Sequence, residues 1–299
     1  MFERILAPLD GSPEAARVVP VVARLSSLMG GSVILLQVLD TATEVTKYTA
    51  ASLSPYTITS DTEGAQGYLD GVATVIAGEG VPVESETRSG GVGQTIVEVA
   101  REKNADAIIL NSHGRTGFLE RLLGGVAEHV SREAPIPVLL LRAGEDQSLG
   151  ATDGSGRSVR ALLPLDGSLA AESALVPTLY LVAALSTPEP GALHLMRLVA
   201  EGQDASAAEN YLSALTERVQ DATPEGLKLE VTWSLPSARS IEDALILLAD
   251  DYDLVALTKP AATGRGALGE TVEKALQHIK LPLLIVPPDT APNPALLEP

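Results

Sequence analysis

The sequence of 299 residues has no cysteine and few aromatic residues, and both absences narrow the class of protein. Without cysteine there can be no disulfides and no thiolate metal sites, which fits a reducing compartment. Phe, Trp and Tyr together make up only 3% of the chain, so its cores must be built from Val, Leu, Ile and Ala. Aliphatic interiors of this kind suit parallel sheets covered by helices.

Basic residues are also scarce, because 21 Lys and Arg stand against 39 Asp and Glu, and the formal net charge is −18. Affinity for nucleic acid rests mainly on cationic side chains that neutralise phosphates, and the sequence has no basic stripe. We therefore expect no nucleic-acid partner. A single small anion in a local pocket is compatible with the overall charge, because nearby charges and backbone dipoles outweigh a distant, screened field.

Long apolar runs are the third absence. No stretch approaches the 20 apolar residues of a membrane helix, and the chain begins with a strand-like run, Phe2–Asp10, rather than with a basic start and an apolar leader. These features predict no membrane association and a cytoplasmic location. The composition, 45% apolar and 20% charged, is that of a globular protein, and the length suffices for two domains.

An internal repeat indicates two domains of the same kind. Residues 5–12 (ILAPLDGS) return as residues 161–168 (ALLPLDGS), and each half ends in a proline-flanked aliphatic run, at 135–142 and at 281–287. Between the halves lies a stretch rich in Gly, Ser, Asp and Thr, which cannot bury enough apolar surface to fold alone. We predict a first domain over 1–142, a linker over 143–158, a second domain over 159–289 and a tail over 290–299.

Strand and helix patterns alternate within each half. The strands expected in the first half lie at 4–9, 32–39, 81–88, 107–110 and within the final aliphatic run. Pro20 and Pro177 fall inside the first helix pattern of their halves, where a break or kink is expected. Alternation of this kind predicts parallel strands joined by right-handed crossovers. The expected fold is α/β, with two repeated domains, each a five-stranded, mostly parallel sheet with helices on both faces.

The loops at the carboxyl ends of the strands are the expected ligand site, because open α/β sheets bind ligands there. In the first half these are Pro8–Asp10 and the loop 111–125 (NSHGRTGFLERLLGG). Its glycines permit positive φ and close approach, and Gly124 and Gly125 precede a helix whose free N–H groups favour a phosphate. From the residues alone two interpretations stay open: an anion cradle, or turn and cap glycines. Asp10 likewise either accepts hydrogen bonds from a nucleoside or caps the first turn.

The paired PLDGS segments, the loop SHGRTG at 112–117 and the proline-flanked final strands resemble the universal stress protein family in its tandem two-domain form. The resemblance covers both halves except the linker. It implies a regulatory or sensory protein that binds ATP, with Mg²⁺ carried by the phosphates. It also implies that the two final strands pair edge to edge, so that one chain forms an intramolecular pseudo-dimer. Whether two chains associate further as a homodimer is left open.

ATP-binding members of this family carry the motif G-x-x-G, nine residues, then G-[S/T], alongside an Asp that ends the first strand. The spacing is complete here, with Asn111, Gly114, Gly124 and Gly125 at the motif positions. Asn tolerates the left-handed backbone better than most residues. Gly in place of the hydroxyl residue removes one side-chain hydrogen bond to phosphate, worth about 1 kcal/mol or somewhat more. We therefore expect weakened rather than abolished binding.

The nucleotide site implied by the resemblance lies wholly in the first half. Pro8, Asp10 and Val38 would flank the base and ribose. The glycines and Val126 would meet the phosphates through backbone N–H groups. Arg115 adds local positive charge. The expected site comprises Pro8, Asp10, Val38, Asn111, Gly114, Arg115, Gly124, Gly125 and Val126.

The second half keeps the PLD segment but not the glycine motif. Counting back from Gly269 places Ala256 and Lys259 at the first two glycine positions, whereas anchoring on the preceding strand gives Thr258 and Ala261. Neither alignment restores the motif.

Glutamate stands at the hydroxyl position of the second half, as Glu270, and Glu273 follows one turn later. Acidic side chains at a helix start stabilise that helix but repel phosphate, so we predict a degenerate second site. Asn111, Gly125 and Glu270 also favour a second interpretation, an interaction scaffold of the same fold that does not bind nucleotide. The four histidines lack ligand spacing and no catalytic set emerges. We therefore predict no enzyme and no protein-bound metal, while slow ATP hydrolysis stays open.

Overall fold

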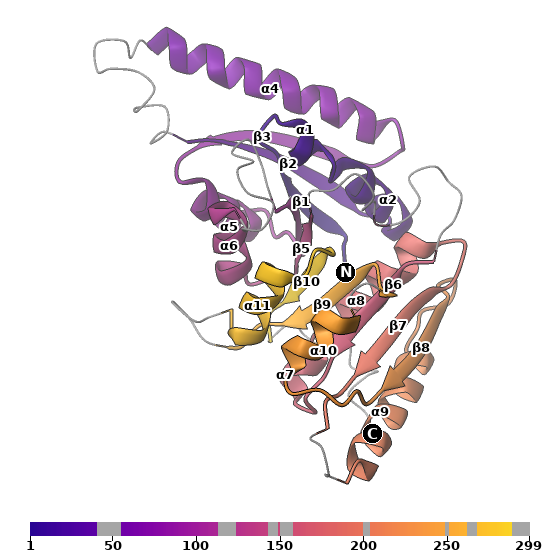
Figure 1. Ribbon diagram of the computed structural model, residues 1–299. Helices are drawn as coiled ribbons and strands as arrows, with labels where there is room; N and C mark the ends of the chain where they lie inside the picture. Colours follow the sequence, from indigo (N-terminus) through magenta and orange to yellow (C-terminus); the bar gives the residue numbers. More distant parts are fainter. Residues whose placement is uncertain are drawn as a thin grey trace. The chain divides into compact units, whose positions relative to one another are not determined.

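The computed structural model describes residues 1–40, 55–112, 124–142, 149, 158–199, 204–248, 251–261 and 268–288. The chain divides into two compact units, Met1–Ala134 and Pro135–Pro299 (Figure 1). The described elements occur in the same order in the first and the second repeat, and each repeat has five strands.

The elements of the first repeat are β1 (Arg4–Pro8), α1 (Pro13–Ala16), α2 (Val19–Met29), β2 (Ser32–Leu39), α4 (Pro55–Ala77), β3 (Val83–Ser89), α5 (Val92–Glu102), β4 (Ala107–Asn111), α6 (Gly125–Glu133) and β5 (Val138–Leu141). The elements of the second repeat are β6 (Arg160–Pro164), α7 (Leu169–Glu172), α8 (Leu175–Ser186), β7 (Gly191–Met196), α9 (Ser206–Asp221), β8 (Leu229–Ser234), α10 (Ile241–Leu248), β9 (Leu254–Thr258), α11 (Glu270–His278) and β10 (Leu283–Val286).

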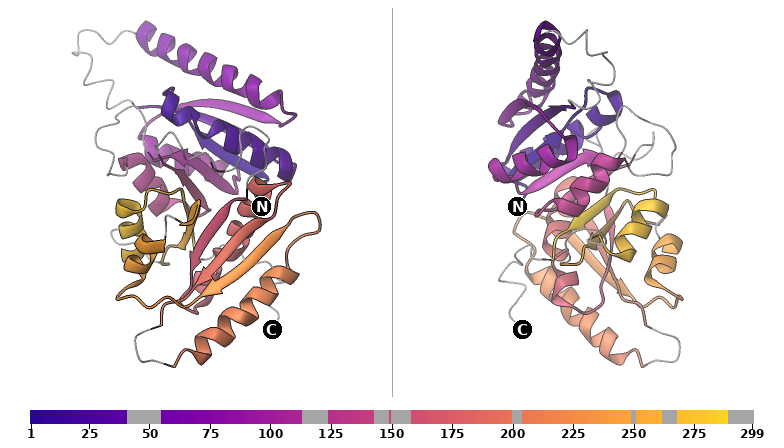
Figure 2. Two further views of the ribbon diagram at one scale, coloured as in Figure 1. Left: turned by 45° about the vertical axis from the view of Figure 1, so that its right-hand side comes forward. Right: turned by 90° about the vertical axis from the view of Figure 1, so that its left-hand side faces the viewer.

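In the first unit four strands form a parallel sheet in the order β3-β2-β1-β4. Helices α2 and α4 pack on one face, whereas α5 packs beside α6 on the other (Figure 2). Right-handed crossovers produce this distribution, because the chain moves outward from β1 to β3 and then returns to β4. The sheet is covered on both faces, and the described residues of β1 between Arg4 and Pro8 are buried.

The first helix of each repeat is broken near its proline, as the sequence predicts. Ser12 caps α1, because its side chain accepts a hydrogen bond from the backbone N–H of Ala15. A separate helix, α2, then begins at Val19 with Pro20 in its first turn, where a missing N–H costs nothing. The second repeat shows the same break between α7 and α8, so the effect belongs to the repeated sequence.

In the second unit the strand order is β5-β10-β9-β6-β7-β8. The pairs β6·β7, β7·β8, β6·β9 and β9·β10 are parallel, whereas β5 pairs with β10 in antiparallel fashion, with Leu139 opposite Leu284. The predicted pairing of the two final strands is therefore confirmed. Because of this pairing, β5 is counted with the second compact unit; the domain bounds at 142 and 159 stay a prediction.

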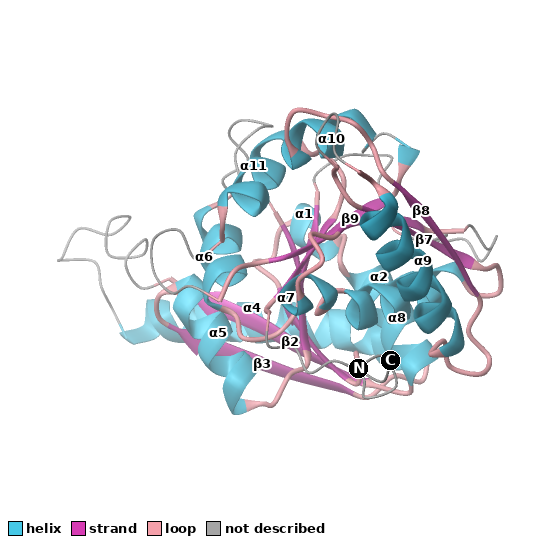
Figure 3. Ribbon diagram, turned by 90° about the horizontal axis from the view of Figure 1, so that it is seen from below, coloured by secondary structure: helices cyan, strands magenta, loops and turns pink. Residues whose placement is uncertain are grey.

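Helices cover both faces of the second unit as well. Helices α8 and α9 pack against β6, β7 and β8, and α10 packs beside α11 on the opposite face (Figure 3). The α/β class, the two repeated domains and the mostly parallel sheets are thus confirmed. One described segment, Leu169–Ser186, is long and apolar enough to cross a membrane by length and composition, but 67% of it is buried inside the second unit. That burial is expected of a core helix.

Candidate functional site

The carboxyl ends of β1 and β2 lie side by side in the first unit and form the floor of the candidate site. Pro8 is opposite Leu36 in the register of the two strands, and the backbone N–H of Leu9 donates to Leu36 O at 2.8 Å. The half-buried Val38 is the next but one residue of β2, and Asp10 follows β1. The structure therefore places Pro8, Asp10 and Val38 at the carboxyl ends of two neighbouring strands, and their part in a nucleotide site stays a prediction.

Asp10 is held by the turn that begins α1. Its Oδ1 accepts hydrogen bonds from the backbone N–H of Ser12 at 2.9 Å and from Ser12 Oγ at 2.6 Å. Ser12 Oγ in turn accepts from the N–H of Ala15 at 3.1 Å. The local capping role that the sequence left open for Asp10 is present. It also fixes the orientation of the carboxylate at the end of β1.

Two polar side chains that sequence reasoning missed lie close to Asp10. Gln37, on β2, is only 9% exposed, and its Oε1 is a buried atom without a hydrogen-bond partner among the described residues. The hydroxyl of Tyr68, on α4, is likewise buried, with no partner in the part of the chain that the structure describes. Burial and, second, the negative charge of Asp10 raise the pKa of this phenol. Native proteins rarely leave such groups unsatisfied, so these two mark a place where a ligand can supply hydrogen bonds.

The end of β4 carries the first motif position. Asn111 is buried in the strand, and its Nδ2 donates to the backbone oxygen of Glu14 at 2.8 Å. Its backbone is extended and not left-handed, because the only described non-glycine residues with positive φ are Phe2 and Asn104. The expectation that asparagine serves here by tolerating a left-handed backbone is therefore wrong. Its amide instead ties β4 to α1.

Helix α6 begins at Gly124 and Gly125, the last two positions of the glycine motif. Gly124 is its N-cap with φ −63° and ψ 141°, and its N–H donates to Ser112 O at 3.1 Å. A Cβ on Gly124 would also lie 3.1 Å from that oxygen, whereas a Cβ on Gly125 would meet nothing within 4 Å. The N–H groups of Gly125 and Val126 are among those that a helix leaves without a partner in its own backbone. Gly114 and Arg115 lie outside the described residues.

The second unit has an equivalent position beyond the ends of β6 and β9. The sheet register shows how the sequence after β9 aligns with the sequence after β4. β4 and β9 pair with equivalent residues of β1 and β6, which sets Thr258 at the position of Asn111. Thr258 Oγ1 donates to Ala171 O at 3.2 Å, a tie between strand and first helix like that of Asn111. Helix α11 begins after Gly269 as α6 begins after Gly124. The strand-anchored alignment is therefore the structural one, and the intervening loop is shorter in the second repeat.

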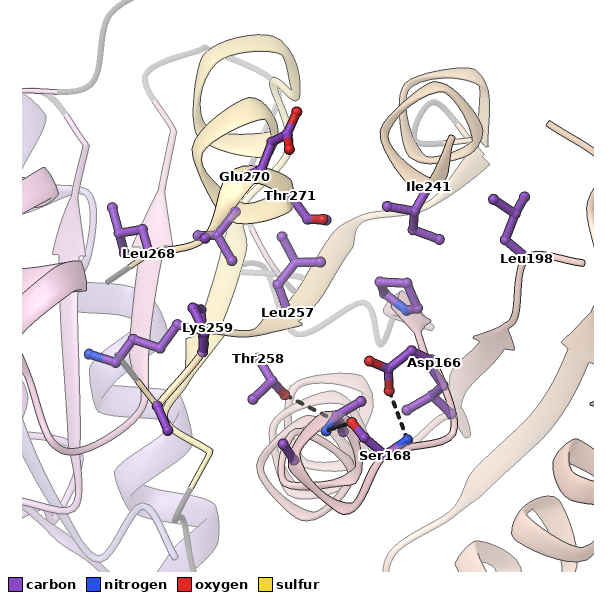
Figure 4. Close-up of a pocket in the computed structure, with 18 of the residues that line it drawn as sticks. Asp166, Ser168, Leu198, Ile241, Leu257, Thr258, Lys259, Leu268, Glu270 and Thr271 are labelled. Carbon is purple, nitrogen blue, oxygen red and sulfur yellow. Dashed lines mark hydrogen bonds between the residues drawn. The ribbon is translucent and has the colours of Figure 1, made fainter. Parts of the chain in front are cut away.

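A cavity of about 630 Å³ lies at this place in the second unit, beyond the ends of β6, β7 and β9 (Figure 4). Its wall is largely apolar. Charged or hydroxyl side chains other than Lys259 line it at six positions: Asp166, Ser168, Arg197, Thr258, Glu270 and Thr271. Lys259 also lines the cavity; it is buried and has a partner of its own. Volumes of this order are typical of sites for small molecules.

The start of α11 is occupied by its own acidic groups. Glu270 is the first helical residue, its Oε1 lies 2.7 Å from Lys274 Nζ, and Glu273 follows in the same turn. Thr271 Oγ1 donates to Glu242 Oε1 at 3.1 Å, so this hydroxyl is also engaged. Acidic side chains in the first turn interact with the positive end of the helix dipole. This helix start therefore disfavours a phosphate, in contrast to the open Gly125 of α6.

No group of three or more His, Asp or Glu is placed to hold a metal ion among the residues that the structure describes. Each repeat is an open α/β sheet, a fold in which ligands bind beyond the carboxyl ends of the strands.

Comparison with known proteins agrees with this class. The sequence model that represents the universal stress protein family matches residues 1–142 of this chain. Universal stress protein MJ0577 of Methanocaldococcus jannaschii is 30% identical over 156 residues, which cover 48% of this chain and 96% of that protein. Universal stress protein Sll1654 of Synechocystis is 31% identical over 142 residues, covering 47% of this chain and 86% of the relative. The chain belongs to the universal stress protein family.

A solved structure extends the likeness of fold over the full length. The crystal structure of a universal stress protein from Archaeoglobus fulgidus matches with a TM-score of 0.73, covering 96% of this chain and 99% of the other. The two sequences are 20% identical, so this likeness concerns the fold alone. The likeness of fold therefore includes both halves of the chain.

Proposed function

We propose that the first repeat binds ATP, with Mg²⁺ carried by the phosphates, and that the protein acts as a regulatory or sensory nucleotide-binding module in the cytoplasm. The observation that carries this proposal is a pair of buried polar atoms near Asp10, Gln37 Oε1 and Tyr68 Oη, which have no hydrogen-bond partner in the described ranges of the chain. Burial of such atoms is costly unless something hydrogen-bonds to them. A nucleoside has hydrogen-bond donors for Gln37 Oε1 and acceptors for the hydroxyl of Tyr68.

The phosphates would meet the start of α6. A bare glycine at the first helical position leaves room for an anion to approach the N–H groups of Gly125 and Val126. Because the N–H of Gly124 already donates to Ser112 O, we assign that residue a supporting role in shaping the turn. Mg²⁺ would neutralise part of the phosphate charge, and no protein ligand for the ion is required.

The second repeat, by this account, does not bind ATP in the ordinary way. Its helix start carries Glu270 and Glu273 in place of an open glycine, and a triphosphate would face both charges. One chain therefore has one ATP site. An interaction scaffold without nucleotide is the second candidate, favoured by the occupied Gly124 N–H; such a protein would give no calorimetric signal with millimolar ATP and Mg²⁺.

Substitution of the two equivalent aspartates separates the repeats. Asp10→Ala is expected to weaken ATP binding at least about tenfold, the loss of hydrogen bonds to one charged group. Asp166→Ala is the matched control, because its Oδ1 accepts from the backbone N–H of Ser168 at 2.8 Å as Asp10 does from Ser12. Calorimetric titration with ATP and Mg²⁺ measures both. Equal losses in the two variants would contradict a site confined to the first repeat.

Restoring a hydroxyl at the start of α6 should strengthen the site. Gly125→Ser is expected to tighten ATP binding about fivefold, because a new hydrogen bond to phosphate contributes about 1 kcal/mol. The added Cβ meets no atom within 4 Å, so the backbone has no reason to move. Gly125→Ala supplies the same Cβ without the hydroxyl and should leave the dissociation constant within about twofold. A gain in the alanine variant equal to that in the serine variant would refute the role of the hydroxyl.

A further inference from the structure

The cavity of the second repeat has no part in the function proposed above, yet it is well formed. Its apolar wall includes Leu165, Leu257, Leu268 and Val272, all buried. The acidic start of α11 disfavours a phosphate there, as shown above. A cavity of this size with an apolar wall, at a helix start that disfavours phosphate, is suited to a ligand of another chemical class.

Arg197 is one of the two described cationic side chains that line this cavity, the other being the buried Lys259. Arg197 is half-buried and follows β7, at the position where the first repeat has Gln37. Its guanidinium lies against the backbone of Gly167, where a Cβ would be 2.9 Å from Nη1. It also stands 5.1 Å above the ring of Tyr211. Among the described residues it donates no hydrogen bond, so the planar donor fork remains available to an anionic group.

The ring beneath Arg197 is itself fixed in place. Tyr211 Oη donates to Glu172 Oε1 at 2.9 Å, and Glu172 Oε2 lies 3.7 Å from Arg218 Nη2. Burial and the adjacent Glu172 carboxylate raise the pKa of the phenol, which stays protonated as a donor. Arg197 is thus held between an anchored aromatic ring and a glycine backbone, and binding would require little further ordering of its side chain.

Asp166 also lines the cavity, and it directly precedes Gly167, the residue against which the Arg197 guanidinium lies. One of its oxygens, Oδ1, accepts from the backbone N–H of Ser168 at 2.8 Å. Burial acts to raise the pKa of Asp166, but hydrogen bonds from Ser168 and the positive charge of Arg197 outweigh it and hold that pKa below its ordinary value. The carboxylate is exposed at the cavity mouth. A fixed anion and a fixed cation therefore sit side by side above an apolar wall.

We propose that the cavity of the second repeat is a binding site for an apolar α-amino acid. The carboxylate of the ligand would bind Arg197, its ammonium group would bind Asp166, and its side chain would enter the cavity against Leu198, Ile241 and Leu257 (Figure 4). A simple carboxylic acid would leave Asp166 uncompensated and a simple amine would leave Arg197 uncompensated. A zwitterion supplies a group of opposite charge to each of them.

The size of the cavity sets the preference among amino acids. About 630 Å³ of space with an apolar wall favours large side chains, because binding energy rises with the apolar surface removed from water. Phenylalanine and leucine are therefore expected to bind at least about tenfold more tightly than alanine, which has only one methyl group to bury. This proposal does not depend on ATP binding to the first repeat.

Calorimetric titration of the full chain with L-phenylalanine, up to about 10 mM, tests the site. We expect saturable binding with one molecule per chain. 2-Phenylethylamine, which lacks the carboxylate, and 3-phenylpropionate, which lacks the ammonium, should each bind at least about tenfold more weakly. No saturable binding of phenylalanine, or equal binding of either analogue, overturns the proposal.

Two variants locate the binding. Arg197→Gln, which installs the residue of the first repeat at this position, should weaken phenylalanine binding at least about tenfold, and Arg197→Lys should restore part of it. Gln37→Ala, at the equivalent position of the first repeat, should leave it unchanged. An unchanged thermal melting curve shows that Arg197→Gln still folds. If that folded variant binds phenylalanine like the parent, or if Gln37→Ala abolishes binding, the assignment to the second repeat is wrong.

Discussion

Replacing Gly125 by glutamate is expected to weaken ATP binding by about 100-fold or more. The substitution installs at the start of α6 the residue that the second repeat carries as Glu270. A carboxylate about 5 Å from a phosphate group, at an effective dielectric of about 20, opposes binding by about 3 kcal/mol per unit of phosphate charge. It also interacts with the helix dipole that the phosphate would use. Calorimetric titration with ATP and Mg²⁺ gives the change in dissociation constant.

Gly125→Gln is the control for this prediction, because it adds a side chain of nearly the same size and shape without the charge. Space is available, since a Cβ on Gly125 has no neighbour within 4 Å. The glutamine variant is expected to bind ATP within about tenfold of the parent. If glutamine and glutamate weaken binding equally, steric exclusion rather than charge is responsible, and the explanation of the second repeat by Glu270 fails.

Removing the buried side chain of Leu284, on the final strand β10, is expected to produce the largest loss of stability. Leu284 is fully buried on β10 and faces Leu139 of β5 across the antiparallel pair. Leu284→Ala is expected to lower the free energy of unfolding of the second unit by about 3 kcal/mol, because it removes buried apolar surface and leaves a cavity. Urea unfolding followed by the fluorescence of Trp233, the single tryptophan, reports on this unit.

The matched control is the same substitution, leucine to alanine, at an exposed position. Leu247, on α10, is 78% exposed, so Leu247→Ala should change the free energy of unfolding by no more than about 0.5 kcal/mol. A loss below about 1 kcal/mol for Leu284→Ala would contradict the packing of the β5·β10 pair.

The fold could be predicted largely from the sequence because its signals are local and occur twice. The PLDGS segments mark the end of β1 and β6, and Ser12 with Pro13 marks the helix that follows. Pro20 and Pro177, which lie one position apart in the aligned repeats, predicted the helix breaks before α2 and α8. The edge pairing of β5 and β10 came from the family resemblance and not from local signals.

The site could be predicted only in part, because its remaining groups come together through the tertiary fold. Gln37 gave one unused signal, a polar residue inside an aliphatic strand. Tyr68 lies on α4, and nothing in the sequence relates it to Asp10. The register of β9 was needed to align Thr258 with Asn111, because the shorter loop makes counting from Gly269 misleading.

The stoichiometry of ATP binding tests the central claim most directly. Titration of the full chain with ATP in the presence of Mg²⁺ should give one molecule of nucleotide per chain, and Asp10→Ala should weaken this single event. Two molecules per chain would contradict the account of the second repeat. Absence of any binding at millimolar nucleotide would contradict the ATP site in the first.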